Sequence, residues 1–176
     1  MLIRKATYDD IKGMAKVNVD SWRTTYKNII PDTYLDSMSY GLREKSFQKA
    51  LGDEQIIVYA AEEDEEDEEV VGYIIGGKNR EIEEFPAYEG ELYALYILKE
   101  FHGRGIGKEL VSKLFGELKA REIQHVMVKV LKGNPAKLFY QRLGAKYVDV
   151  PCFEISYSKL AEEVYGWENA PFDIKK

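Results

Sequence analysis

The stretch from Glu91 to Arg121, ELYALYILKEFHGRGIGKELVSKLFGELKAR, decides the fold. It begins with an almost unbroken apolar run, Leu92 to Leu98, which is typical of a strand covered on both faces. A glycine-rich segment follows, and beyond it apolar residues recur at helical spacing: Leu110, Val111, Leu114, Phe115 and Leu118. The stretch therefore predicts a buried strand, a glycine loop and an amphipathic helix that packs back against the strand.

The loop between strand and helix, Gly103 to Gly107 (GRGIG), could hold an anion through its backbone. Glycines let the backbone approach a ligand closely, and the N–H groups at the start of the next helix then point at it. Two nucleotide-binding patterns fail on spacing. The third glycine of a dinucleotide motif would fall on Lys108 or Leu110, and a Walker loop would need Ser or Thr at Glu109.

The glycine spacing resembles the signature of the GNAT superfamily of N-acetyltransferases: Gln or Arg, two residues, Gly, any residue, then Gly or Ala. Gly105 and Gly107 take the glycine places, and His102 stands where Gln or Arg is usual. Because such a loop binds largely through backbone N–H groups, we expect binding of acetyl-CoA to survive the change at His102. The resemblance identifies the loop's cofactor-binding residues as His102, Gly103, Arg104, Gly105, Ile106, Gly107 and Lys108.

A second stretch, Asn134 to Gly144 (NPAKLFYQRLG), predicts a short helix. Asn134 is suited to the N-cap, Pro135 to the first helical position, and Gly144 to the position just past the end. One face of this helix would carry Ala136, Phe139, Tyr140 and Leu143. The stretch resembles a later GNAT motif whose tyrosine lies near the thioester sulfur, which implies that Asn134, Phe139 and Tyr140 also contact the cofactor.

The rest of the chain predicts further strands and helices. Strands are expected over 2–6, 55–61, 70–78, 125–131, 146–150, 153–158 and 161–167, and helices over 11–26 and 32–51, the second interrupted near Gly41. The resemblance implies one α/β (α+β) domain over residues 1–167, with 168–176 as a tail. Its GNAT-like core would be a mixed, mostly antiparallel twisted sheet of about six to seven strands, flanked by about four helices.

Composition excludes several classes of function. The formal net charge of −6 argues against nucleic acid as a partner. No apolar run is long enough to span a membrane, and no signal peptide is evident, so a cytoplasmic protein is expected. The single cysteine, Cys152, excludes an intrachain disulfide and a cysteine-rich metal site. The acidic run from Glu62 to Glu69 is interpreted as a solvated connection rather than a metal site.

Acetyl transfer from a thioester to an amine needs groups that the resemblance assigns. Leu95 and Ile97 would line the acyl arm, with backbone N–H groups near Ile97 stabilising the oxyanion. Tyr140, whose ordinary pKa is near 10, would protonate the leaving thiolate, although a tyrosine on an apolar helix face can also be purely structural. Glu91 shares strand parity with Tyr93, Leu95 and Ile97, so it is either a general base or a solvated strand-end carboxylate.

The acceptor side is less defined. The resemblance implies that the first helix and the segment after it form one wall of the acceptor pocket, which makes Trp22, Tyr26 and Tyr34 candidate substrate-binding residues. Tyr93, on the central strand, is a fourth candidate. For Trp22 and Tyr26 the competing interpretation is simple core packing. Acidic residues from Glu81 to Glu91 would attract a cationic amine or merely form a solvated loop.

The leading hypothesis is an acetyl-CoA-dependent N-acetyltransferase that acts on a primary amine of a small molecule or peptide, by direct transfer in a ternary complex and without a metal. The alternative is a non-catalytic acyl-CoA-binding sensor or regulatory protein. A succinyl or propionyl donor also stays open, because nothing in these residues sizes the acyl pocket. Dimers are common in the family, so a homodimer is one expectation.

Overall fold

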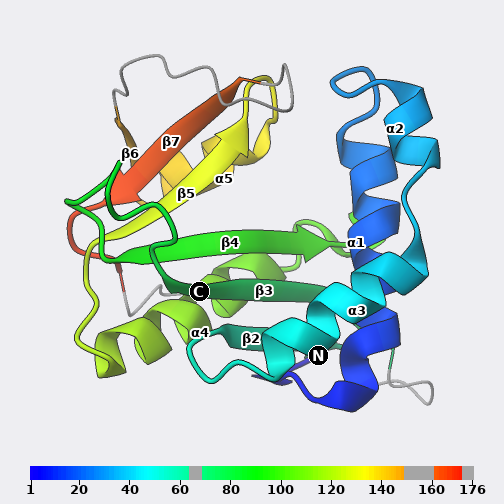
Figure 1. The fold of residues 1–176 in the computed structure, drawn as a ribbon, viewed down its shortest axis with the longest axis horizontal. Helices are drawn as coiled ribbons and strands as arrows, with labels where there is room; N and C mark the ends of the chain where they lie inside the picture. Colours follow the sequence, from blue (N-terminus) through cyan, green and yellow to red (C-terminus); the bar gives the residue numbers. More distant parts are fainter. Residues whose placement is uncertain (64–68, 149–160, 172–176) are drawn as a thin grey trace.

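A computed structural model describes residues 1–63, 69–148 and 161–171. Within these ranges seven strands form one sheet in the order β1-β2-β3-β4-β5-β7-β6, with only β4 and β5 parallel among the paired neighbours (Figure 1). The strands are β1 (Leu2–Lys5), β2 (Ile57–Glu62), β3 (Val70–Lys78), β4 (Gly90–Ile97), β5 (Val126–Leu131), β6 (Lys146–Val148) and β7 (Glu162–Trp167). This confirms the expected mixed, mostly antiparallel sheet.

The same ranges contain five α-helices: α1 (Ile11–Thr25), α2 (Asp32–Asp36), α3 (Tyr40–Leu51), α4 (Ile106–Ala120) and α5 (Ala136–Arg142). Short 3₁₀ turns, Tyr8–Asp10 and Lys99–Phe101, precede α1 and the glycine loop. The break in the 32–51 segment lies at 37–39 rather than near Gly41, because the Ser39 hydroxyl accepts the Leu42 N–H (3.4 Å) and caps α3 there. The predicted 153–158 strand, residues 149–150 and Cys152 lie outside the described residues.

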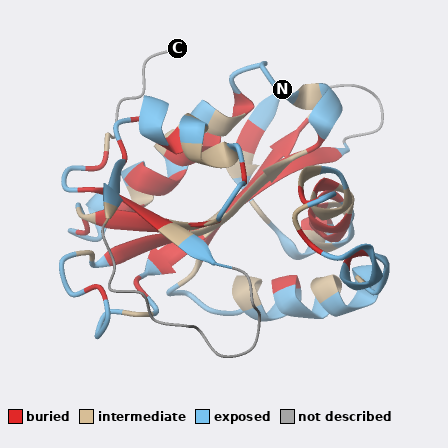
Figure 2. Cartoon of the chain, turned by 90° about the horizontal axis from the view of Figure 1, so that it is seen from above, coloured by how far each residue is buried: buried red, intermediate tan, exposed pale blue. Residues whose placement is uncertain are grey.

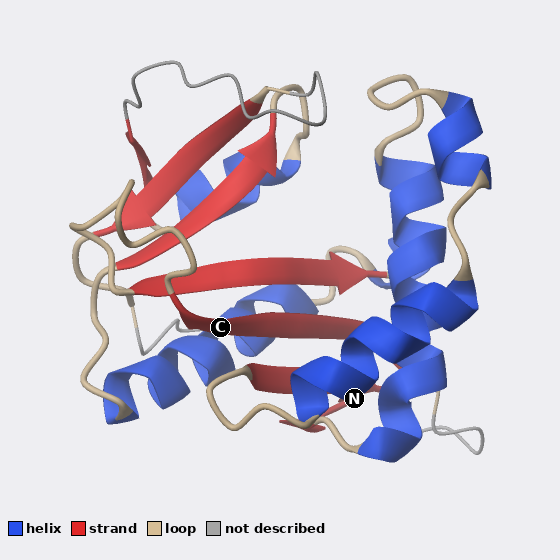
Figure 3. Cartoon of the chain, in the orientation of Figure 1, coloured by secondary structure: helices blue, strands red, loops and turns tan. Residues whose placement is uncertain are grey.

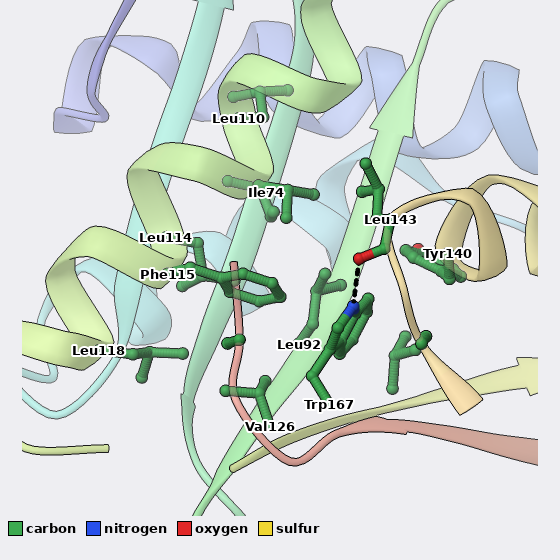
Figure 4. Packing of buried hydrophobic residues seen from close by; sticks show 14 of the residues in the cluster. Ile74, Leu92, Leu110, Leu114, Phe115, Leu118, Val126, Tyr140, Leu143 and Trp167 are labelled. Carbon is green, nitrogen blue, oxygen red and sulfur yellow. Dashed lines mark hydrogen bonds between the residues drawn. The ribbon is translucent and has the colours of Figure 1, made fainter. Parts of the chain in front are cut away.

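Helices cover both faces of the sheet (Figures 1 and 3). On one face, α4 packs Leu110, Leu114 and Leu118 along Ile74 and Leu92 (Figure 4). On the other face, α1 and α3 cover residues of β2 and β3. Buried residues accordingly follow the strands and the inner sides of the helices (Figure 2). In the described part of the chain, no helix combines the length and apolar character needed to cross a membrane.

The β4 and β5 strands pair over only three positions, Gly90 to Leu92 against Val126 to Val128. Beyond Leu92, β4 stays paired with β3 and β5 stays paired with β7, so the two strands part (Figure 3). We call the region between residues 93–97 of β4 and 129–131 of β5 the splay. The first three residues of β4 are buried but 93–97 are only partly so, which corrects the expectation of a strand covered throughout.

A β-bulge in β4 marks the start of the splay. The pairing with β3 passes from Ile75–Ala94 to Gly76–Leu92, which leaves Tyr93 as the extra residue. The bulge reverses the alternation, so that Leu92, Leu95 and Ile97 all pack on the α4 side. Glu91 therefore lies on the opposite face from Leu95 and Ile97, and the predicted shared parity is wrong.

The C-terminal part of the described chain is joined to α5. The Trp167 indole N–H donates to the carbonyl of Leu143 (3.0 Å), as Figure 4 shows, and its ring packs edge-on against Phe115 (5.0 Å between centroids). Ala170 is also buried, and its N–H donates to Gln124. These contacts hold α5 beside β5 and β7 at the edge of the splay.

Candidate active site

The glycine loop leads directly into the first turn of α4. Gly103 and Gly105 adopt left-handed conformations (φ 79° and 84°), which favour glycine, and no atom lies within 4 Å of the Cβ that either would carry. Because α4 begins at Ile106, the N–H groups of residues 106–108 have no partner within the helix. The loop is therefore an open turn whose backbone donors can bind an anion, and it fits the diphosphate of coenzyme A.

Gly107 is the point at which the loop, β4 and α5 meet. A Cβ there would lie 3.2 Å from the Phe139 ring and 3.4 Å from Ile97 Cδ1. Both distances are close for a methyl group, so the small residue lets α4 begin directly against β4 and α5. The glycine loop and the splay are thus neighbouring parts of one site.

The backbone of β4 is directed into the splay at alternate residues. Leu98 N–H donates to Val71 on β3 (2.9 Å). In an antiparallel pair, successive residues direct their backbone N–H and C=O groups alternately toward and away from the neighbouring strand. Because Leu98 bonds β3, the backbone groups of Ile97 and Leu95 point away from β3, into the space that β5 leaves. The Leu95 backbone therefore faces the position at which an acyl arm could lie between the strands.

The carbonyl of Ile97 already has partners. The His102 ring nitrogen Nε2 lies 2.9 Å from it, and the Ser21 hydroxyl donates to it over 3.4 Å. His102, the residue that departs from the family signature, thus holds the end of β4 next to the glycine loop. Arg104 in the loop stacks over Phe101 (4.7 Å) and pairs with Glu63, and Lys108 is exposed in the first turn of α4.

Tyr140 lies on the predicted face of α5, with its ring packed against Phe139 and Trp167. The side chain is buried, and burial raises the pKa of its hydroxyl above the ordinary value. That hydroxyl makes no hydrogen bond within the described residues, whereas the hydroxyls of the other buried tyrosines, Tyr26, Tyr73 and Tyr165, are all bonded. Within the described residues the Tyr140 hydroxyl thus has no hydrogen bond that would compete with a ligand.

Asn134 caps α5 as predicted: its side-chain oxygen accepts the Ala136 N–H (2.9 Å), and Pro135 is already helical. Its amide nitrogen donates to the hydroxyl of Tyr26 on α1 (3.2 Å), which lies 3.2 Å from the hydroxyl of Tyr96 on β4. These three side chains join α1, β4 and α5 across the open end of the splay. Tyr96 was not among the predicted residues, because the bulge that turns it toward α1 leaves no signal in the hydrophobic alternation.

Three of the four predicted substrate residues lie together. The Trp22 ring contacts those of Tyr26 (4.7 Å between centroids) and Tyr34 (6.2 Å), and Arg43 stacks over it (5.6 Å). Tyr34 is half exposed, so this aromatic group reaches the surface. The fourth predicted residue, Tyr93, is engaged elsewhere.

Tyr93 and Glu91 belong to a second cluster, at the closed end of the splay. The Tyr93 hydroxyl donates to the Lys78 carbonyl (2.6 Å), and Arg80 stacks over the Tyr93 ring (4.0 Å). Glu91 is 1% exposed, and both of its carboxylate oxygens accept from Arg80, one of them from the backbone N–H (3.1 Å) and from Nε (3.0 Å). Glu91 is thus a buried, ion-paired residue rather than a solvated one.

Comparisons with known proteins agree with this geometry. The model of the acetyltransferase (GNAT) family matches residues 19–145. The uncharacterized N-acetyltransferase YuaI of Bacillus subtilis (strain 168) is 37% identical over 166 residues, which span 94% of this chain and 91% of YuaI. An N-acetyltransferase of Haemophilus influenzae, named for the alanine of ribosomal protein bS18, is 34% identical over 62 residues, 35% of this chain and 42% of that protein.

Among solved structures, PaiA N-acetyltransferase from Thermoplasma acidophilum, in complex with coenzyme A, superposes with a TM-score of 0.72 at 21% identity. The match covers 94% of this chain and 96% of PaiA, and shows that the two share a fold. The family match extends from α1 to the end of α5 and includes both the glycine loop and Tyr140. The chain therefore belongs to the GNAT family of acetyltransferases.

Proposed function

We propose that this acetyltransferase moves an acetyl group from acetyl-CoA to a primary amine of a small molecule or peptide, by direct transfer in a ternary complex. The observation that carries the proposal is the Tyr140 hydroxyl, which lies on a buried side chain beside the splay and has no partner in the described structure. A hydroxyl so placed can donate a proton to a leaving group at the edge of the splay.

The donor would be held along two neighbouring parts of the site. The loop from His102 to Lys108 would bind its phosphates, mainly through backbone N–H groups. The Leu95 backbone would bond the acyl arm inside the splay, bordered by Ile97, Asn134 and Phe139. Bound in this way, acetyl-CoA supplies the activated acetyl group.

The transfer needs one bond to form and one to break. The amine nitrogen attacks the thioester carbonyl carbon, the C–N bond forms, and the C–S bond breaks. Tyr140 donates its proton to the leaving sulfur, and the amine gives up a proton, so that the phenol is restored by way of solvent. Glu91 stays a candidate base, but it could accept a proton only if Arg80 moved away from it.

The amine would approach from the α1 side, past Trp22, Tyr26 and Tyr34; Tyr93 would contribute only if its bond to Lys78 broke. A peptide N-terminus is a favoured acceptor, since one relative is named for the alanine of a ribosomal protein. The acidic chain would act in the cytoplasm, without nucleic acid or a membrane as partner, and as a homodimer if it follows the family.

The test combines binding with turnover. Acetyl-CoA should raise the midpoint of thermal unfolding, because it binds only the native state. Release of free thiol should then be measured across polyamines, amino acids, aminoglycosides and peptides, with propionyl- and succinyl-CoA as alternative donors. Thiol release that depends on one class of amine would support the proposal. A clear thermal shift with no thiol release from any amine would favour the sensor hypothesis instead.

A substitution at Gly107 should weaken donor binding. In Gly107→Val, the added side chain would meet Phe139 and Ile97 and push the start of α4 away from them, so we expect affinity for acetyl-CoA to fall about tenfold, the equivalent of one lost hydrogen bond. Gly116→Val is the matched control, since Gly116 lies on the same helix with open space around it. Calorimetry giving equal affinities for the two variants would contradict the assignment of the loop.

A further inference from the structure

The hydroxyls of Tyr26 and Tyr96 form a pair at the open end of the splay, 3.2 Å apart. Tyr26 reaches it from α1 and is buried, whereas Tyr96 comes from β4 and is partly exposed. Burial raises the pKa of both hydroxyls, so both stay protonated and able to donate.

The orientation of Asn134 fixes what this pair receives. Its side-chain oxygen accepts the Ala136 N–H (2.9 Å), so its amide nitrogen must face Tyr26 (3.2 Å). An amide nitrogen only donates. Asn134 therefore donates a hydrogen bond to the tyrosine pair and accepts none from it.

A count of hydrogens then leaves one donor unused. Each phenol carries one hydrogen, and the bond between Tyr26 and Tyr96 uses one of the two. The other has no acceptor within the described residues. A largely buried donor without an acceptor is unfavourable, so this hydrogen is available to a ligand with a suitable oxygen.

The position of the pair indicates which ligand that is. Tyr96 lies between Leu95 and Ile97, whose backbone groups face the splay, and Tyr26 bonds Asn134, which directly precedes the helix that carries Tyr140. The unused hydrogen therefore borders the path of the acyl arm, whose acceptors are carbonyl oxygens.

We propose that the Tyr26–Tyr96 pair, oriented by Asn134, donates a hydrogen bond to a carbonyl oxygen of the acyl-CoA arm. The proposal rests on the proposed function, since it requires that the arm lie in the splay. Two carbonyls have the required chemistry, that of the thioester and that of a pantetheine amide. Tyr96 would then be a positioning residue that sets the depth of the arm relative to Tyr140.

The test compares the Tyr26→Phe/Tyr96→Phe double variant, and each single variant, with the wild type by calorimetry, using acetyl-CoA and free coenzyme A. Loss of one neutral hydrogen bond should weaken binding by about two- to tenfold. If the bond goes to the thioester, only acetyl-CoA binding weakens; if it goes to a pantetheine amide, both ligands lose affinity equally. Each single substitution, Tyr96→Phe or Tyr26→Phe, leaves the hydrogen of the other phenol, so the Tyr26→Phe/Tyr96→Phe double variant is the decisive one and should show this loss for the same ligands.

Tyr73→Phe is the matched control. Tyr73 lies next to Tyr96 (5.9 Å between ring centroids), but it is buried away from the splay and accepts from Asn18 (2.6 Å). It should lower stability without changing either affinity. Wild-type affinities in the Tyr26→Phe/Tyr96→Phe double variant, or an equal loss in Tyr73→Phe, would overturn this proposal and leave the proposed function intact. A wild type that binds neither ligand would overturn the proposed function and this proposal with it.

Discussion

Tyr140→Phe should lower kcat by about a hundredfold or more, with little change in affinity for acetyl-CoA, because general acid catalysis contributes factors of that size. The variant removes only the hydroxyl, which makes no hydrogen bond within the described structure, and keeps the ring that packs against Phe139 and Trp167. The fold should therefore be preserved. Thiol release at saturating amine gives kcat, and calorimetry gives the affinity.

The control is Tyr147→Phe, since Tyr147 is exposed on β6, and it should leave kcat unchanged. An unchanged kcat in Tyr140→Phe would remove this residue from the mechanism. A loss of cofactor affinity as large as the loss of kcat would make Tyr140 a binding residue instead.

The pH dependence follows from the direction of the pKa shift. Because burial raises the pKa of Tyr140 above its ordinary value of about 10, the phenol stays protonated throughout neutral and moderately alkaline conditions. Activity should therefore rise with pH as the amine loses its proton. It should not decline at any pH below about 10, because Tyr140 keeps its proton there. A fall in wild-type activity at a pH well below about 10, if it is absent in Tyr140→Phe, would contradict this prediction.

The sequence predicted the parts of the fold that depend on local patterns. The glycine loop, the capped helix after Asn134 and the strands expected at 70–78 and 125–131, observed at 70–78 and 126–131, follow from spacing and turn residues. The roles assigned to the site residues stay predictions, and the structure shows only where these residues lie. Tyr140 lies beside the splay, where its hydroxyl has no partner among residues 1–63, 69–148 and 161–171, and Trp22, Tyr26 and Tyr34 lie together.

The features that were missed arise from long-range pairing. Strand parity assumes unbroken alternation, and the bulge at Tyr93 reverses it, so the sequence could neither place Tyr96 toward α1 nor separate Glu91 from Leu95. The ion pair between Arg80 and Glu91 depends on how the β3–β4 connection folds over the sheet. No spacing rule predicts such a contact.

That ion pair leads to the second large effect. Arg80→Ala should lower the free energy of unfolding by about 3 kcal/mol, the lower end for a buried pair that loses one partner. Glu91 is 1% exposed and would lose the guanidinium that bonds both of its carboxylate oxygens, although the backbone N–H of residue 80 would still bond one of them. Urea denaturation, followed by fluorescence, measures the change.

Arg104→Ala is the matched control, because the two arginines are about equally exposed (57% and 53%) and only their partners differ. Glu63, the partner of Arg104, is 30% exposed, so its pair should contribute less than about 1 kcal/mol. Equal losses in the two variants would mean that Glu91 gains water or another partner once Arg80 is removed. Whether Glu91 acts as the general base is a separate measurement: a fall in kcat in Glu91→Gln at unchanged acetyl-CoA affinity would support that role.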